Sequence, residues 1–203
     1  MTIILIIITV AVSYAALKSP KLMDQLQFNA SKIYHRKEYH RLITHAFVHA
    51  NWEHLFVNMI VLFSFGRAIE VYFEYNFGSL HTVYFILLYL GGILFSNLYS
   101  LFKYRNDYFY NAVGASGAVA AVLFCAIFFD PWNMIYFFGI LPIPGIVFAV
   151  LYLVYSYQMS KKQKDNVAHD AHFLGALYGF VFPVLLSPRL FELFLDKLFR
   201  LIE

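Results

Sequence analysis

Three sets of polar side chains interrupt the apolar runs of this chain, and one set is centred on a serine. Ser116 lies in the stretch Gly114-Ala115-Ser116-Gly117, directly before an apolar run. The glycines predict a turn and then a hydrophobic helix with Ser116 in its first turn, close to free backbone N–H groups and the positive end of the helix dipole. Such a position stabilises a developing negative charge. Small residues are also common where membrane helices pack, so this stretch alone does not distinguish packing from catalysis.

The second set is a histidine–asparagine pair in another apolar run. His54 and Asn58 are four residues apart, on one face of a helix, and both side chains can donate hydrogen bonds. Strongly polar residues inside membrane spans are costly, so they are functional candidates by default. Taken singly, each also has a structural explanation as a satisfied core residue.

The third set is a histidine at the head of a glycine stripe. His172, Gly175 and Gly179 recur at helical spacing, and the glycines permit close approach of a neighbouring helix. If that neighbour carries Ser116, a nucleophile and a base meet. The three sets together supply a nucleophile, a base and an oxyanion stabiliser, which are the parts that acyl transfer needs.

The composition indicates the surroundings of these residues. The chain has 203 residues, of which 61% are hydrophobic and 13% are charged, against roughly 25% charged in a soluble domain. This predicts an integral membrane protein with one domain, residues 1–203, and no separate soluble domain. The net charge of +3 gives no indication of nucleic-acid binding. The single Cys125 has no partner for an internal disulfide and is interpreted as a buried apolar residue.

Six apolar segments are long enough, or nearly so, to cross a bilayer, so we predict an all-α, polytopic membrane protein. They are residues 2–17, 52–72, 80–101, 114–129, 136–157 and 168–186. The first has no basic region before it, so we expect a retained span and not a cleaved signal peptide. The fourth is short, and a helix that begins inside the membrane must have its N–H groups satisfied by protein or water. Pro142 and Pro144 predict that the fifth is kinked or begins after them.

Two regions outside these segments have features of their own. Residues 18–51 are too many for a structureless loop, so we expect local structure at the membrane interface. Residues 189–203 alternate Phe or Leu with charge, which predicts an amphipathic interfacial helix. Eleven of the 15 Lys and Arg residues fall in loops 18–51, 101–112 and 159–168, on one side of a six-span bundle. By the positive-inside rule that side would be cytoplasmic.

The motifs and their order resemble those of the rhomboid family of intramembrane serine proteases. The resemblance covers almost the whole chain and rests on three motifs, which are His54-x-x-x-Asn58, Gly114-Ala115-Ser116-Gly117 and Ala171-His172-x-x-Gly175-x-x-x-Gly179. Further marks are His40-Arg41, Thr44-His45-Ala46 and Gly66-Arg67-Ala68-Ile69-Glu70. Three motifs in order, each on the expected segment, make the resemblance specific.

The resemblance implies a six-helix membrane bundle with a long membrane-embedded loop, residues 18–51, between the first two spans. It implies a Ser116–His172 dyad without a third acidic residue, and an oxyanion hole made by His54, Asn58 and the Ser116 backbone N–H. The glycines expected to pack the helices at the site are Gly114, Gly117, Gly175 and Gly179. The substrates would be transmembrane segments of other membrane proteins, cut at a locally unwound site with a small residue before the scissile bond. No metal or other cofactor is expected, and a monomer suffices for one dyad.

Bacterial members of the family imply a place in the inner membrane, with both termini cytoplasmic and the site open to the outer side. This conflicts with the charge count, and we prefer the family expectation because basic groups that snorkel from an embedded loop are poor topological signals. Two positions depart from the family pattern. His40 stands where the family often has Trp, and Ala120 stands where well-known members stack an aromatic residue on the catalytic histidine. Tyr178 or His169 would then orient His172.

Two alternatives compete with the serine-protease interpretation. A metalloprotease is suggested by histidines that recur every four or five residues, namely His35, His40, His45, His49 and His54. The pair His45-x-x-x-His49 nevertheless lacks the glutamate of a His-Glu-x-x-His site. The other alternative is a catalytically inactive rhomboid-like protein that binds transmembrane helices. The intact serine, histidine and donor residues favour an active enzyme.

Overall fold

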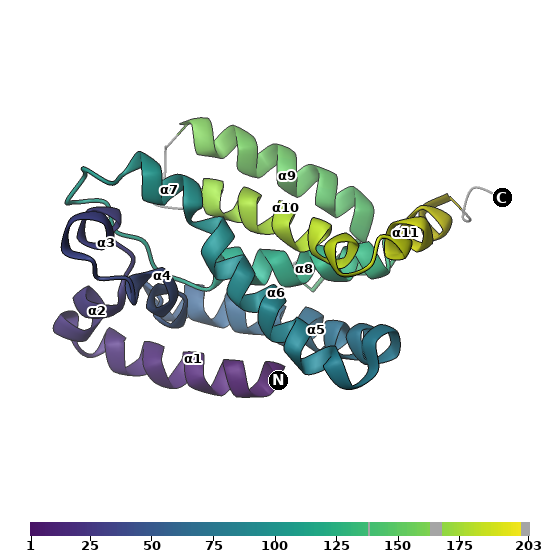
Figure 1. Cartoon of the computed structure of the whole chain (residues 1–203), viewed down its shortest axis with the longest axis horizontal. Helices are drawn as coiled ribbons and strands as arrows, with labels where there is room; N and C mark the ends of the chain where they lie inside the picture. Colours follow the sequence, from purple (N-terminus) through teal and green to yellow (C-terminus); the bar gives the residue numbers. More distant parts are fainter. Residues whose placement is uncertain (138, 163–167, 200–203) are drawn as a thin grey trace.

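The computed structural model describes residues 1–137, 139–162 and 168–199, and this part of the chain is mostly helical with one antiparallel hairpin (Figure 1). The elements are α1 (Thr2–Leu17), α2 (Pro20–Leu26), α3 (Ala30–Arg36), α4 (Arg41–Thr44), the 3₁₀ turn η1 (His45–Phe47), α5 (Trp52–Phe77), the 3₁₀ turn η2 (Gly78–Leu80), α6 (His81–Ser96), α7 (Leu98–Lys103), α8 (Ser116–Phe129), β1 (Met134–Phe137), β2 (Leu141–Pro144), α9 (Gly145–Lys162), α10 (His169–Leu186) and α11 (Arg189–Phe199).

Helix α8 is the centre of the fold (Figure 1). Every residue from Gly117 to Phe129 is buried, and only Ser116 at its start is half-buried. The helix packs against α10, α6 and α5. A helix that is hydrophobic on all faces requires neighbours on all sides, which explains why the other helices surround it.

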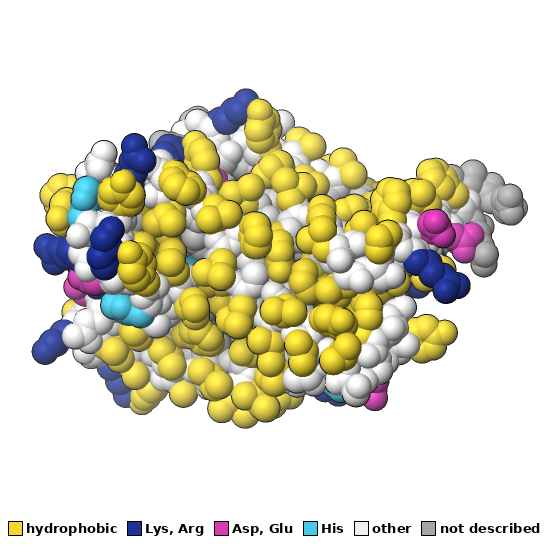
Figure 2. Space-filling view, in the orientation of Figure 1, with side chains coloured by type: hydrophobic (Ala, Val, Ile, Leu, Met, Phe, Trp, Pro, Cys, Tyr) yellow, Lys and Arg dark blue, Asp and Glu magenta, His cyan; other side chains and the backbone are white. Residues whose placement is uncertain are grey.

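Several helices have the length or apolarity expected next to lipid. By length and composition, the stretches Trp52–Lys103 and His169–Leu186 are long and apolar enough to cross a membrane, while α1 and α8 are apolar but shorter. Figure 2 shows hydrophobic side chains across the middle of the molecule, with Lys and Arg gathered mainly at the end that carries α2, α3 and α7. A continuous apolar surface of this extent indicates contact with a membrane or a partner.

The connection between α1 and α5 has structure of its own, as predicted, because it contains α2, α3, α4 and η1. Asn29 caps α3 by accepting a hydrogen bond from the Lys32 backbone N–H at 2.8 Å. Arg41 is 3% exposed and donates to the Glu38 carboxylate at 2.6 Å and to the Gln27 carbonyl at 2.9 Å. One buried guanidinium therefore joins the two halves of this connection.

Of the two predictions for the fifth segment, the helix that begins after the prolines is confirmed, whereas the helical start at residue 136 is wrong. Met134–Phe137 and Leu141–Pro144 instead pair as the hairpin of β1 and β2, in which Met134 lies opposite Pro144 and Phe137 lies opposite Leu141. Helix α9 begins only at Gly145. Proline lacks a backbone N–H and disfavours helical backbone in the residue before it, so Pro142 and Pro144 exclude this segment from the helix.

Two other boundaries differ from the prediction. The second segment continues to Phe77, and the third is divided at Asn97 into α6 and α7. The Asn97 side chain donates to the Ile93 carbonyl at 3.0 Å. A short polar side chain that bonds to nearby backbone competes with the helical pattern, which accounts for the break.

The tail forms the helix that the sequence predicts, α11, with Leu190 and Phe194 buried against the bundle. The Lys197 ammonium donates to the Phe129 carbonyl at 2.7 Å, at the C-terminal end of α8. A cation there satisfies a terminal carbonyl and interacts favourably with the helix dipole. Residues 200–203 of the predicted tail and residues 163–167 of the predicted loop 159–168 lie outside the described residues.

Candidate active site

Ser116 is the first residue of α8, as the sequence predicts, and it follows a turn that only glycine accommodates. Gly114 has a φ of +114°, in the region that residues with a side chain rarely adopt. A Cβ atom at this position would lie 2.6 Å from Cε1 of His54. Gly114 therefore belongs to the turn before the helix, and its function is to admit the His54 ring. The expectation that it packs two helices needs this correction.

Two backbone hydrogen bonds fix the turn that leads to Ser116. The Gly114 N–H donates to the His45 carbonyl at 2.9 Å, and the Ala115 N–H donates to Nε2 of His49 at 3.3 Å. Both acceptors belong to the segment from η1 to the start of α5. The position of the serine is thus set from the α1–α5 connection.

His49 is held in one tautomer by its neighbours. The Ser13 hydroxyl donates to the Phe47 carbonyl at 2.9 Å, so its oxygen accepts from Nδ1–H of His49, also at 2.9 Å. This leaves Nε2 as the acceptor for the Ala115 N–H. His49 is fully buried, and burial lowers its pKa to about 3, with a smaller contribution from the nearby His54. The ring therefore stays neutral and keeps its acceptor at physiological pH.

His45 is a second buried, neutral histidine in the same segment. Its Nδ1–H donates to the Arg41 carbonyl at 2.8 Å, and its Nε2 accepts from the Asn97 amide at 3.0 Å. Burial lowers its pKa to about 4, against a smaller opposing effect of the Arg41 carbonyl. The roles of His45 and His49 were not predicted. Their spacing suggested metal ligands, and Thr44-His45-Ala46 was noted only as a mark of the family, whereas their partners Ser13, Asn97 and Ala115 lie far away in the sequence.

The two candidate oxyanion donors lie in the first turns of α5. The His54 ring is half-buried, packs against Gly114, and makes an edge contact with the His49 ring at a centroid distance of 4.9 Å. Asn58 is 5% exposed and donates one amide hydrogen to the His54 carbonyl at 2.8 Å. The His54 ring thus reaches the turn before the serine, and Asn58 keeps a second amide hydrogen.

Helices α8 and α10 approach each other at their glycines. A Cβ atom on Gly175 would lie 2.2 Å from the Gly117 carbonyl oxygen, and one on Gly179 would lie 2.0 Å from the Ala121 carbonyl oxygen. A Cβ atom on Gly117 would lie 3.5 Å from the Ala171 carbonyl oxygen. The residue after Ser116 thus meets the residue before His172. The turns that carry the two side chains face each other, and both side chains are half-buried.

Aromatic side chains surround the His172 ring in a way that the sequence did not reveal. Tyr152 of α9 lies nearly parallel to it, with 22° between the planes and 6.4 Å between the centroids. The His169 ring presents an edge contact at 5.9 Å. Tyr152 packs in the same cluster as Ala120. A ring from α9, and not one from position 120 of α8, therefore packs on the His172 ring.

Tyr178, the other residue considered for orienting His172, has a different role. Its hydroxyl donates to the Leu87 carbonyl at 3.1 Å, and its ring stacks on Phe95 at 4.8 Å, so it faces α6. The periodicity of α10 gave no indication of this because spacing along one helix does not identify the neighbouring helix.

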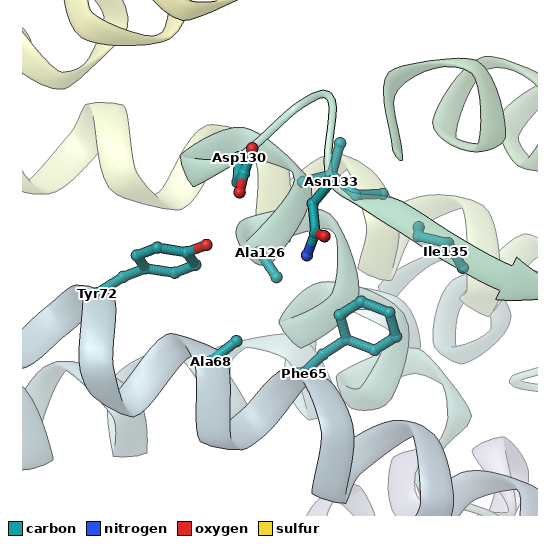
Figure 3. A pocket seen from close by; sticks show the side chains of 8 residues that line it. Phe65, Ala68, Tyr72, Ala126, Asp130, Asn133 and Ile135 are labelled. Atoms are coloured by element: carbon teal, nitrogen blue, oxygen red, sulfur yellow. The ribbon is translucent and has the colours of Figure 1, made fainter. Parts of the chain in front are cut away.

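A small cavity lies at the opposite end of α8 from Ser116 (Figure 3). It has an empty volume of about 270 Å³ between α5, α8 and β1. Its polar lining residues are Tyr72, Asp130 and Asn133. None of the candidate catalytic residues lines it, so this cavity belongs to the far end of the bundle.

Comparison with known proteins identifies the family. The rhomboid domain model matches residues 36–189, which include all the residues described at this site except Ser13. RHOMBOID-like protein 12, mitochondrial, from Arabidopsis thaliana is 28% identical over 152 residues, which are 68% of this chain and 43% of that protein. The chain thus spans less than half the length of this relative. Because the domain model covers most of the sequence, this chain belongs to the rhomboid family of membrane proteins.

Proposed function

We propose that the chain is an intramembrane serine endopeptidase that hydrolyses peptide bonds in transmembrane segments of other membrane proteins. Ser116 is the nucleophile, and His172 is the general base and then the general acid. The observation that carries this proposal is the contact between Gly117 and Gly175, which brings the first turns of α8 and α10 together. Family membership supports the same reaction class.

The proposed reaction proceeds through an acyl-enzyme. His172 accepts the proton of the Ser116 hydroxyl while the oxygen attacks the substrate carbonyl carbon. The His54 ring, the second amide hydrogen of Asn58 and the Ser116 backbone N–H donate to the tetrahedral oxyanion. His172 then gives its proton to the leaving amine. A water molecule, deprotonated by the same ring, releases the acyl group.

The membrane arrangement is part of the proposal. Six spans are formed by α1, α5, α6 with α7, α8, α9 and α10, within one domain that comprises residues 1–203. The connection that contains α2, α3 and α4 flanks the bundle as the embedded loop. A substrate helix that unwinds next to Ser116 exposes its backbone to the dyad. No second copy of the chain is required for this reaction.

The proposed orientation places both termini in the cytoplasm and the Ser116 end on the outer side of a bacterial inner membrane. Lys162, at the end of α9, then lies outside. A single reactive cysteine introduced at Lys162, with Cys125 replaced by alanine, should react with a membrane-impermeant thiol reagent on intact cells. Labelling only after permeabilisation would reverse the orientation and support the charge count instead.

The direct test is labelling of Ser116 by a fluorophosphonate probe in the purified, folded chain. We expect covalent labelling of the wild type, and neither labelling nor cleavage of a transmembrane substrate by Ser116→Ala. His172→Ala should lose both as well, while Ser79→Ala, which changes an exposed serine in η2, should still be labelled. A folded wild type that binds transmembrane helices without labelling would instead support the inactive, helix-binding alternative.

The metalloprotease alternative has less support. Both ring nitrogens of His45 and both of His49 are occupied by hydrogen bonds to the protein. Within residues 1–137, 139–162 and 168–199, no group of three or more His, Cys, Asp or Glu side chains converges. The metalloprotease alternative would be supported if the Ser116→Ala variant still cleaved a substrate and a chelator abolished that cleavage.

A further inference from the structure

A dense group of cations and aromatic rings lies at the Ser116 end of the bundle, outside the candidate active site. The end of α3 and the turn after α7 come together there, because the Asn29 amide donates to the Tyr108 carbonyl at 3.0 Å and His35 pairs with Asn106 at 3.2 Å. Phe28 and Ala112 also form a β-bridge. The basic patch, as it is named below, consists of Arg36, Lys37, Lys103 and Arg105.

Each cation of the basic patch lies over a tyrosine ring. Arg36 lies 5.7 Å from the ring centre of Tyr108. Lys37 and Arg105 approach Tyr34 at 5.5 Å and 5.7 Å, and Lys103 approaches Tyr99 at 5.2 Å and Tyr104 at 4.9 Å. All four charged residues are exposed. Contact with the rings orders these long side chains without neutralising them.

The cations of the basic patch are not paired with acidic side chains. In the described part of the chain, the ion pairs between side chains are Lys32–Asp24, Arg41–Glu38 and Arg67–Glu70, so none of the four cations takes part. The nearby Asp107 accepts a hydrogen bond from the Phe109 backbone N–H at 2.9 Å and carries one negative charge against four positive ones. The surface therefore keeps a net positive charge that favours binding of an anion.

The surroundings of the basic patch identify the kind of anion. Phe109 is 93% exposed and Phe102 is 64% exposed, and both lie among the cations in sequence. Exposed rings next to Lys and Arg are typical of the level at which hydrocarbon meets lipid headgroups. Figure 2 shows hydrophobic side chains between the basic ones at this end of the molecule. An acidic protein segment would match the charges but would leave the Phe side chains in water.

We propose that the basic patch is a binding site for anionic phospholipid headgroups, in which the cations contact the phosphate groups and the exposed Phe side chains enter the acyl layer. The segment that carries Lys103 and Arg105 leads directly to Gly114 and Ser116. A bound lipid therefore stabilises the connection that ends at the serine. This site does not depend on proteolysis and can be tested without it.

The test uses the purified full chain in nanodiscs of phosphatidylcholine alone or mixed with phosphatidylglycerol. Preference for a spin-labelled phosphatidylglycerol over the matching phosphatidylcholine is measured by electron paramagnetic resonance, and thermal unfolding is followed in parallel. A juxtamembrane cation contributes about fivefold to binding of an anionic lipid. We expect R36Q/K37Q/K103Q/R105Q to lose at least tenfold in preference, together with the thermal stabilisation by phosphatidylglycerol.

The matched control removes the same charge from the same end of the molecule. K18Q/K21Q/K161Q/K162Q should keep the preference, because these residues lie outside the basic patch. The variant K37Q/R105Q removes only the two exposed cations over Tyr34, and circular dichroism checks its fold. It allows the proposal to be tested even if the quadruple variant misfolds. Equal losses in the patch and control variants, or a wild type without preference, would overturn the proposal. Capture of an acidic peptide by a wild type that has no lipid preference would also overturn it.

Discussion

The two partners of the candidate dyad are supported in different ways. The turn before Ser116 is held by directional hydrogen bonds, from the Ala115 N–H to His49 and from the Gly114 N–H to a carbonyl. The helix that carries His172 is held by close backbone packing of α10 on α8, and the His172 ring packs against Tyr152 of α9 face to face and against His169 edge-on. The turn before the nucleophile is thus fixed by hydrogen bonds, and the base also packs against a ring from a separate helix.

This difference predicts that the packing of the two backbones is the most sensitive feature. Gly175→Val places a branched side chain against the Gly117 carbonyl, where backbone atoms cannot move aside. We expect loss of probe labelling and of substrate cleavage, with a lower unfolding temperature, because overpacking displaces α10 from α8. Leu177→Val, on the exposed face of the same helix, is the control and should retain activity. A fully active Gly175→Val variant would contradict the proposed geometry.

On the side of the serine, His49→Phe preserves the volume but removes both hydrogen-bonding atoms. It leaves the Ala115 N–H without its acceptor, at a cost of about 1–3 kcal/mol, while the Ser13 hydroxyl keeps its bond to the Phe47 carbonyl. If this cost raises the activation free energy of the reaction by the same amount, kcat falls roughly 5- to 150-fold.

His49→Gln is the matched variant for this position. The glutamine oxygen can accept from the Ala115 N–H, so part of the lost kcat should return while KM stays close to that of the wild type. Equal kcat values for the two variants would show that the hydrogen bond to Ala115 does not position the serine.

For the base His172, the aromatic ring that packs on it can be supplied by α8 in place of α9. Tyr152→Leu removes the ring that stacks on His172, and an aromatic pair contributes about 0.5–1.5 kcal/mol. We therefore expect kcat to fall roughly 2- to 13-fold and the pH profile of kcat to shift. Adding Ala120→Tyr to this variant fills the same space from α8 and should restore activity. Ala120→Tyr alone should be harmful, because Ala120 is buried in a cluster against which Tyr152 already packs, and a larger side chain overpacks it. Additive losses in the double variant would contradict this interpretation.

The weakest effect near neutral pH concerns stability. His45 and His49 have pKa values of about 4 and about 3 in the folded chain, against about 6.5 in the unfolded chain. Below the unfolded value the unfolded chain binds more protons, so stability that is complete above about pH 6.5 falls as the pH decreases toward 4. The slope is about 1.4 kcal/mol per pH unit for each histidine. Chemical unfolding in micelles at a series of pH values should show this slope, and the His49→Gln variant should have about half the slope of the wild type. Identical slopes in both proteins would contradict the buried, neutral state of His49.

The sequence predicted the features that depend on local spacing. A hydrophobic helix that begins at Ser116, a structured connection between the first two long helices and a helical tail are all present. The hairpin of β1 and β2 was missed because its strands are as apolar as a span, so only the two prolines distinguish this region from a helix. The support of the site was missed for another reason. Ser13, His49 and Tyr152 contact residues that are 20 or more positions away in the sequence, and no periodicity within one segment records such contacts.

The length of α8 has a consequence for where cleavage occurs. Its 14 residues span about 21 Å, whereas the hydrocarbon core of a bilayer is about 30 Å thick. In the proposed membrane arrangement, with the Phe129 end of α8 at one surface, Ser116 would lie about 9 Å below the other surface. On the proposed function, the enzyme therefore selects the bond at a fixed depth in a substrate helix, and a thinner or thicker bilayer shifts the cleavage position along that helix.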